Sequence, residues 1–221
     1  MNSTLFFCIM FCTCISIGLA DPGNLQDTCP TGPQTMFING LLCKNPVNIS
    51  ASDFKSTKLR DAGNTKNSLG SAVSIATDID FPGLNTLGLS TARTDLEVDG
   101  LVTPHSHPRA TEMFFLYKGS VMAGFIDTHN KVFRKLMKAG DVIVFPRGLF
   151  HFCYNVGSEF ATAYSVLNSQ NPGVMDNADA ISISNSGIMN KIKNRLISSP
   201  ESEVKDTNDA TLSGFSGLHF A

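Results

Sequence analysis

Hydrophobic and polar residues alternate in short runs between about Val73 and Leu167. The runs are rich in Val, Ile and Phe and are broken at close intervals by Gly, Pro, Asn and Asp, as in SAVSIATDI, TLGLSTARTDL, EMFFLYKGSVMAGFI, KVFRKLMKAGDVIVFP and HFCYNVG. Short alternating runs of this kind are typical of antiparallel strands. No helix-length amphipathic pattern interrupts them. The pattern predicts an all-β barrel or sandwich with its core at about residues 73–170.

A helical pattern begins only after this region. Ile188, Ile192 and Leu196 repeat at four-residue spacing with basic residues between them, as on a solvated helix face. Ser199 and Pro200 then suit the N-cap and first position of a second helix. We expect two short C-terminal α-helices at about residues 187–206, and no second domain within residues 21–221.

The first twenty residues, MNSTLFFCIMFCTCISIGLA, carry no charged side chain and are apolar from about Leu5 to Leu19. The run ends in the small residues Gly18 and Ala20, which favours a secretory signal peptide at residues 1–20. It is shorter than the ~20 residues of a membrane span, although an uncleaved anchor is the alternative. We predict a secreted protein with no later membrane span.

Composition narrows the range of partners. The chain has 221 residues, 42% of them hydrophobic, and a formal net charge of -2. This hydrophobic content suits one folded domain with a substantial core. The small net charge argues against nucleic acid or an acidic membrane as the main partner. Small molecules or other proteins are the expected partners.

Removal of residues 1–20 would leave three cysteines, namely Cys29, Cys43 and Cys153. In an oxidising compartment Cys29 and Cys43, which flank a stretch containing Pro and Gly, are the natural disulfide pair, and Cys153 stays a thiol. The alternative is that both are free and buried. The sequon NIS makes Asn48 a candidate glycosylation site, which fits the same compartment.

Candidate chemistry is concentrated in the stretch TPHSHPRATEMFF. On a strand, His105 and His107 would point the same way and could bind one ion. Pro108 cannot donate a hydrogen bond to a neighbouring strand, so the strand should end there. Glu112 then begins the next strand and would place its carboxylate at the mouth of the same inward face.

A further candidate ligand lies in PRGLFHFCYN, where alternation puts His151, Cys153 and Asn155 on one face. Three imidazoles and one carboxylate suit Mn²⁺ or Fe²⁺ in octahedral geometry with two positions open, whereas structural zinc favours four ligands and thiolates. An isolated histidine is more often structural, which is our interpretation of His129 and His219.

Two stretches, HSHPRATE followed after six residues by Gly119, and PRGLFHFCYN, resemble the two cupin boxes of the germin and germin-like proteins. The similarity extends through DPGNLQDTC, INGLLCK, NTLGLSTARTDL and NSQNPG, up to about Gly173. The resemblance implies a cupin β-jelly-roll barrel, an N-terminal disulfide, and a hexamer built as a trimer of dimers in the plant apoplast or cell wall. It also implies a manganese ion bound by His105, His107, Glu112 and His151.

The chain departs from the germins that oxidise oxalate at three pocket positions. Ala92 and Val102 replace two asparagines, and neither side chain can donate the hydrogen bonds that a bound dicarboxylate needs. Cys153 replaces a glutamine and is a weak donor. It could fill space as a small hydrophobe, which we favour, or be oxidised by peroxide made nearby. Oxalate oxidation is therefore not expected.

Three functions remain at this level. The leading hypothesis is a manganese superoxide dismutase, because superoxide needs no pocket beyond an open metal position. The second is a non-catalytic binder of a small auxin-like carboxylate or a cell-wall receptor, with an apolar pocket rim at Val98, Leu101 and Val102. The third is a storage or purely structural protein of the same family.

Overall fold

The computed structural model describes residues 26–176. The strands are β1 (Thr35–Ile38), β2 (Leu41–Lys44), β3 (Ser71–Ala76), β4 (Ser90–Leu96), β5 (Leu101–Ser106), β6 (Glu112–Lys118), β7 (Ser120–Ile126), β8 (Val132–Lys138), β9 (Val142–Phe145), β10 (Phe150–Asn155), β11 (Ala161–Leu167) and β12 (Met175–Asp176). Three single-turn 3₁₀ helices precede or interrupt them: η1 (Pro46–Asn48), η2 (Ala51–Phe54) and η3 (Pro82–Leu84). Within the described residues, no helix is long and apolar enough to span a bilayer.

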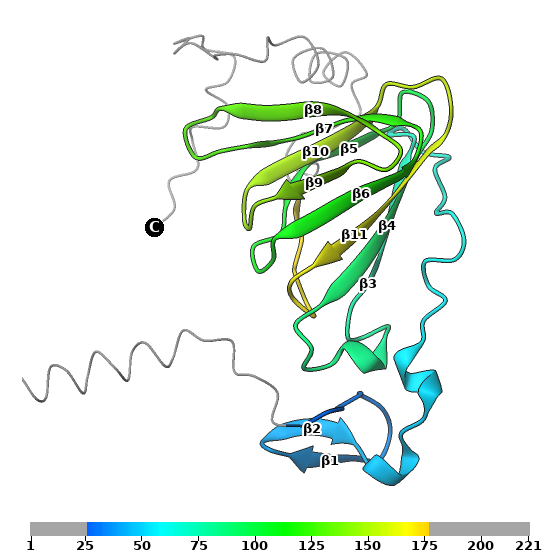
Figure 1. Ribbon diagram of the computed structural model, residues 1–221, viewed down its shortest axis with the longest axis vertical. Coiled ribbons are helices and arrows are strands. Elements are labelled where there is room, and N and C mark those ends of the chain that lie inside the picture. The colour runs from blue at the N-terminus through cyan, green and yellow to red at the C-terminus, as the bar shows by residue number, and fades with distance from the viewer. Residues whose placement is uncertain (1–25, 177–221) are drawn as a thin grey trace, which may run out of the picture.

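Ten strands form two antiparallel five-stranded sheets that face one another (Figure 1). One sheet has the strand order β12-β5-β10-β7-β8 and the other β3-β4-β11-β6-β9. Most strands that are adjacent in a sheet are distant in sequence; β11, for example, lies between β4 and β6. The predicted jelly-roll barrel is confirmed, and strands β3 to β11 span residues 71–167, close to the expected core. The predicted signal peptide and C-terminal helices lie outside the described residues.

Strand β6 shows how the sequence pattern builds this barrel. Glu112, Phe114 and Leu116 are buried, whereas the residues between them are exposed, as a period of two requires when one face of a sheet is covered. Buried side chains from both sheets meet between them and form the main hydrophobic core, beside which a smaller cluster lies. The polar residue at the start of this inward row, Glu112, therefore faces the barrel interior.

The hairpin β1–β2 lies apart from the two sheets (Figure 1). A disulfide joins Cys29 to Cys43, the predicted pair, with their Cα atoms 4.7 Å apart. The amide of Asn85, beside η3, donates to the carbonyl of Cys29 over 2.8 Å. The disulfide closes the N-terminal segment on itself, and this hydrogen bond connects the segment to the chain between β3 and β4.

A β-bulge in β5 changes which of its residues face inward. His105 pairs with His151 and Val102 pairs with Cys153, so two residues of β5 lie opposite a single residue of β10 between these pairs. The extra residue reverses the alternation, and bulges commonly redirect a side chain beside a functional site. Val102 and His105 consequently face the same side, which strict alternation would not allow.

Candidate metal centre

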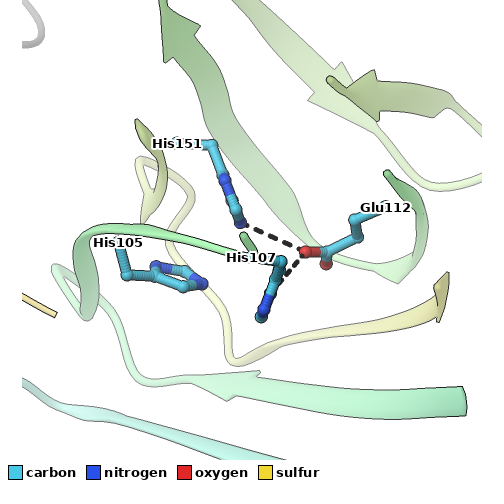
Figure 2. Close-up of side chains that lie close together, drawn as sticks. All are labelled: His105, His107, Glu112 and His151. Atoms are coloured by element: carbon cyan, nitrogen blue, oxygen red, sulfur yellow. Dashed lines mark ion pairs between the residues drawn. The ribbon is translucent and has the colours of Figure 1, made fainter. Parts of the chain in front are cut away.

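Four side chains converge at one end of the barrel (Figure 2). One ligand atom from each of them lies within 4.8 Å of the others. The histidines come from β5, the turn after it and β10, and the carboxylate comes from the first residue of β6 in the facing sheet. The set consists of His105, His107, Glu112 and His151. The structure therefore brings together all four residues that the sequence proposed as ligands.

His107 reaches the cluster differently from the prediction. Strand β5 ends at Ser106, so His107 lies in the following turn rather than in the strand. Its carbonyl accepts a hydrogen bond from the Gly148 amide over 3.0 Å. The turn is thus tied to the β9–β10 loop, which precedes His151.

Each imidazole is oriented by a backbone carbonyl that contacts its Nδ1 atom. The three carbonyl oxygens belong to Thr103, Gly173 and Leu149 and lie 2.9, 2.7 and 3.0 Å from His105, His107 and His151 respectively. Because a carbonyl can only accept, Nδ1 carries the proton and Nε2 keeps a free lone pair. Metal-binding histidines are commonly held in this way.

The two oxygens of the Glu112 carboxylate have different neighbours. Oε1 accepts a hydrogen bond from the Ser165 hydroxyl over 2.6 Å, while Oε2 lies 3.1 Å from Nε2 of both His107 and His151 (Figure 2). These 3.1 Å contacts are not hydrogen bonds when Nε2 has no proton. Within residues 26–176, neither Oε2 nor Nε2 of His151 has a hydrogen-bond partner.

Buried polar atoms without partners are costly unless something satisfies them. A cation among these atoms would accept the lone pairs of the nitrogens and balance the carboxylate. Three nitrogen donors and one oxygen donor match the preferences of Mn²⁺, Fe²⁺ and similar ions. The residues present therefore fit a divalent metal ion.

Burial tunes the charges of the cluster. Burial, with the neighbouring His151, lowers the pKa of His105 to about 4, so this imidazole is neutral at pH 7. Burial also opposes ionisation of Glu112, but the adjacent His107 and His151 and the Ser165 hydroxyl outweigh it and lower the pKa of this carboxyl. A negative carboxylate beside the neutral His105 imidazole suits a metal cation. At His107, burial is outweighed by the contact with Glu112, which raises the pKa of this imidazole, so a metal ion competes there with a proton.

The chain is similar in sequence to known proteins. A family model described as Cupin matches residues 57–200. Germin-like protein subfamily 3 member 4 of Arabidopsis thaliana is 55% identical over 181 residues, which cover 80% of this chain and 86% of the relative. The chain belongs to the germin-like proteins of the cupin family.

Two solved structures are similar to this chain in sequence and in fold. A recombinant oxalate oxidase in complex with glycolate is 33% identical and has a TM-score of 0.65, over 81% of this chain and 99% of the other. Peruvianin-I, described as a cysteine peptidase from Thevetia peruviana latex, is 39% identical and has a TM-score of 0.63, over 71% of this chain and 97% of the other.

Three predicted pocket residues of the germin-like chain lie on the inner face of the barrel. Ala92 is buried on β4 and is paired with Ser165, the residue that contacts Glu112. Val102 packs against the main core, and Cys153 is 4% exposed. The surroundings of Glu112 therefore offer apolar contacts at the positions where oxalate-oxidising germins carry amides.

The prediction of Asn155 as a pocket residue is wrong. Asn155 ends β10 at the opposite end of the barrel, where its side-chain amide donates to the carbonyls of Leu96, Glu97 and Glu159 over 3.3, 2.9 and 2.7 Å. The strand face that Asn155 shares with His151 correctly indicated an inward side chain, but it did not indicate the distance of that side chain from the metal-binding end. Asn155 is a structural residue that ties two turns together.

The predicted apolar rim is also displaced. Leu101 is fully buried at the start of β5, and Val98 lies in the exposed turn before it. Both are at the Asn155 end, since Leu101 pairs with Tyr154, next to Asn155. Of the three, Val102 lies nearest to His105 along β5, and the bulge turns it inward.

Sequence reasoning missed the residues that support the ligands. Ser165, the Gly173 carbonyl and Phe145 belong to this group; the Phe145 ring stacks on His151 with centroids 4.5 Å apart. Ser165 is a polar residue at an inward position of the run ATAYSVL, which was a visible signal. Its partner could not be identified without the strand register.

Proposed function

We propose that this germin-like protein is a manganese-dependent superoxide dismutase, which converts two superoxide ions and two protons into oxygen and hydrogen peroxide. The observation that carries the proposal is the buried convergence of three Nε2 lone pairs with the unpartnered Oε2 atom of Glu112. Four protein ligands would leave positions on a six-coordinate ion open to a small substrate.

Each ligand has a defined role in this proposal. His105, His107 and His151 would donate through Nε2, since their Nδ1 atoms are held by carbonyls, and Glu112 would supply the negative charge through Oε2. A manganese ion supplies the one-electron couple between Mn²⁺ and Mn³⁺ that dismutation requires. The Phe145 ring against His151 limits rotation of that imidazole and keeps one side of the cluster apolar.

Oxalate is not the proposed substrate, although oxalate oxidases are among the structural neighbours. Recognition of a dicarboxylate needs hydrogen-bond donors beside the ion. Ala92 and Val102 supply none from their side chains, and the Cys153 thiol is a weak donor. Superoxide, a diatomic anion, requires only the ion and an approach to it.

A peptidase activity like that named for Peruvianin-I has no suitable nucleophile among the described residues. Cys153 is their only cysteine outside the disulfide. Burial and the nearby Glu112 raise its pKa, so the reactive thiolate is disfavoured. The thiol is also inaccessible to a peptide.

A non-catalytic binder of a small aromatic carboxylate is the second candidate. Ala92 and Val102 give the metal-binding end an apolar wall, and a carboxylate could ligate the ion. Calorimetric titration of the metal-loaded protein with auxin-like acids tests it. No heat and no displacement at millimolar ligand would exclude this function.

We further propose secretion to the apoplast or cell wall, with residues 1–20 as the signal peptide and glycosylation at Asn48. The disulfide supports an oxidising compartment, and Asn48 is exposed at the end of η1. Intact-mass measurement of protein secreted by plant cells, before and after glycosidase treatment, tests both the cleavage near Ala20 and the glycan.

We also propose a hexamer built as a trimer of dimers. The outer face of the sheet that carries β6 exposes a group of apolar side chains in adjacent rows, and such a surface is unusual on a monomer. The group comprises Met113, Phe115, Val142, Val144 and Val166. Light scattering of the wild type and of Met113→Lys tests it: a wild-type monomer would refute the hexamer.

The experiment for the dismutase compares purified protein before metal removal, after chelation and after reloading with Mn²⁺. Activity should disappear on chelation and return on reloading. His105→Ala should abolish both metal binding and activity, whereas His129→Ala, whose side chain is 89% exposed outside the cluster, should change neither. Metal-loaded protein without activity above that of free Mn²⁺ would refute the dismutase.

A further inference from the structure

Ser165 is the only side chain that the structure shows donating a hydrogen bond to the Glu112 carboxylate within the described residues. Its hydroxyl lies 2.6 Å from Oε1, and Ser165 is itself 1% exposed. Hydrogen bonds to an ionised acceptor are short and strong. The contact is therefore a buried, charge-assisted hydrogen bond to a proposed metal ligand.

The sheet register creates this contact across two strands. Glu112 of β6 pairs directly with Leu167 of β11, and Ser165 lies two residues before Leu167 on the same inward face. Diagonal neighbours of this kind are within reach of a long side chain. Ser165 is also paired with Ala92 on its other side, so a small apolar neighbour leaves Glu112 as the partner of the hydroxyl.

The hydrogen bond distinguishes the two carboxylate oxygens. Oε1 is engaged by Ser165, while Oε2 faces Nε2 of His107 and His151. A carboxylate can bind an ion through one oxygen or through both. With Oε1 held away from the imidazoles, Glu112 presents a single oxygen to the ion.

We propose that Ser165 is a positioning residue that makes Glu112 a one-oxygen ligand and so preserves an open position on the metal. This inference rests on the metal site of the proposed function but not on dismutation. If the hydroxyl is removed, Oε1 loses its partner and is free to turn toward the ion. The metal would then bind more weakly, and the carboxylate would occupy a position otherwise open to water or substrate.

The test uses the full-length secreted protein, stripped of metal and titrated with Mn²⁺. Electron paramagnetic resonance measures the affinity, and water-proton relaxation measures the number of water molecules on the bound ion. Loss of an outer hydrogen-bond partner typically weakens metal binding by about 10–100-fold. Ser165→Ala should show this loss and fewer bound water molecules, and Ser165→Thr, which keeps the hydroxyl, should recover most of the affinity.

Ser90→Ala is the matched control. Ser90 is also 1% exposed, faces inward on the neighbouring strand β4, and its hydroxyl has no hydrogen-bond partner within residues 26–176. Its removal should leave the Mn²⁺ affinity and hydration unchanged. An equal loss of affinity in this variant would show that any change in the interior weakens the site, and would overturn the assignment of Ser165.

The outcomes separate this inference from the dismutase. If Ser165→Ala binds Mn²⁺ with wild-type affinity and hydration, the role of Ser165 is refuted while the metal site stands. If the wild type binds Mn²⁺ without dismutating superoxide, the proposed activity fails and the effect of Ser165 remains measurable. A wild type that binds no Mn²⁺ would overturn both.

Discussion

Both ends of the barrel contain buried polar side chains, but these side chains differ in whether their polar atoms have hydrogen-bond partners. At one end, the amide of Asn155 donates to three carbonyls and its oxygen accepts from the Gly157 amide. At the other end, Oε2 of Glu112 and Nε2 of His151 have no hydrogen-bond partner within the described residues. The first arrangement stabilises the fold, whereas the second is incomplete without a cation.

This contrast distinguishes a structural polar residue from a ligand when both are buried on inward strand faces. Buried polar groups are normally hydrogen-bonded, and an exception calls for an explanation. Substitution should therefore affect stability at the Asn155 end and metal affinity at the Glu112 end. The following experiments test that division.

The largest effect is expected for Glu112→Gln, which keeps the size of the side chain but removes its charge. Mn²⁺ affinity should fall on the order of 1,000-fold, beyond the 10–100-fold typical of an outer-shell partner. Thermal stability of the metal-free protein should fall only slightly: the contacts that lower the pKa of the carboxyl are lost, but the amide keeps an oxygen that can accept from the Ser165 hydroxyl. A large loss of metal-free stability with normal affinity would contradict the contrast between the two ends.

The next largest effect is expected at the opposite end of the barrel, where substitution should lower stability but leave metal affinity unchanged. Asn155→Ala should lower the free energy of unfolding by about 3 kcal/mol, because several buried carbonyls lose their donor. Mn²⁺ affinity of the folded fraction should be retained. Denaturant unfolding checks the first result, and Asn64→Ala, at an exposed residue with a local hydrogen bond, should change stability by less than about 0.5 kcal/mol.

A smaller effect should follow from adding donors to the metal-binding end. The double variant Ala92→Asn with Val102→Asn should bind glycolate roughly 30-fold more tightly than the wild type, since two new hydrogen bonds of about 1 kcal/mol each add about 2 kcal/mol. Calorimetry of the Mn²⁺-loaded proteins measures this. Val98→Asn, at the opposite end of the barrel, is the control and should have no effect; unchanged glycolate binding in the double variant would argue against Ala92 and Val102 as determinants of specificity.

The smallest effect concerns Cys153, which lies on the inner face between the two ends. Because its thiol is buried in the core and its pKa is raised, native protein should resist iodoacetamide, and Cys153→Ser should change the rate of peroxide inactivation by less than about twofold. Mass spectrometry after peroxide treatment provides the check. Selective oxidation of Cys153 before the methionines would instead support a redox-sensitive thiol.

Part of the site could be predicted because its signals are local. The spacing of His105 and His107, the proline after them and the position of Glu112 at the start of an alternating run all act within a few residues. Alternation along β6 correctly placed Glu112, Phe114 and Leu116 inward, because the pleat gives strand side chains a period of two regardless of their partners. The candidate ligands and the barrel architecture were therefore evident from the sequence.

Other features were decided only by pairing between distant strands. The bulge that turns Val102 inward exists because β5 and β10 differ by one residue in their register. Ser165 meets Glu112 only because β11 lies beside β6. Asn155 lies far from the four candidate metal ligands because it ends β10 beside the turns at residues 97–100 and 156–159, which its side chain contacts. Such relationships arise from hydrogen bonds between segments far apart in the chain, whereas the sequence alone determined which residues alternate between the two faces along a regular strand such as β6.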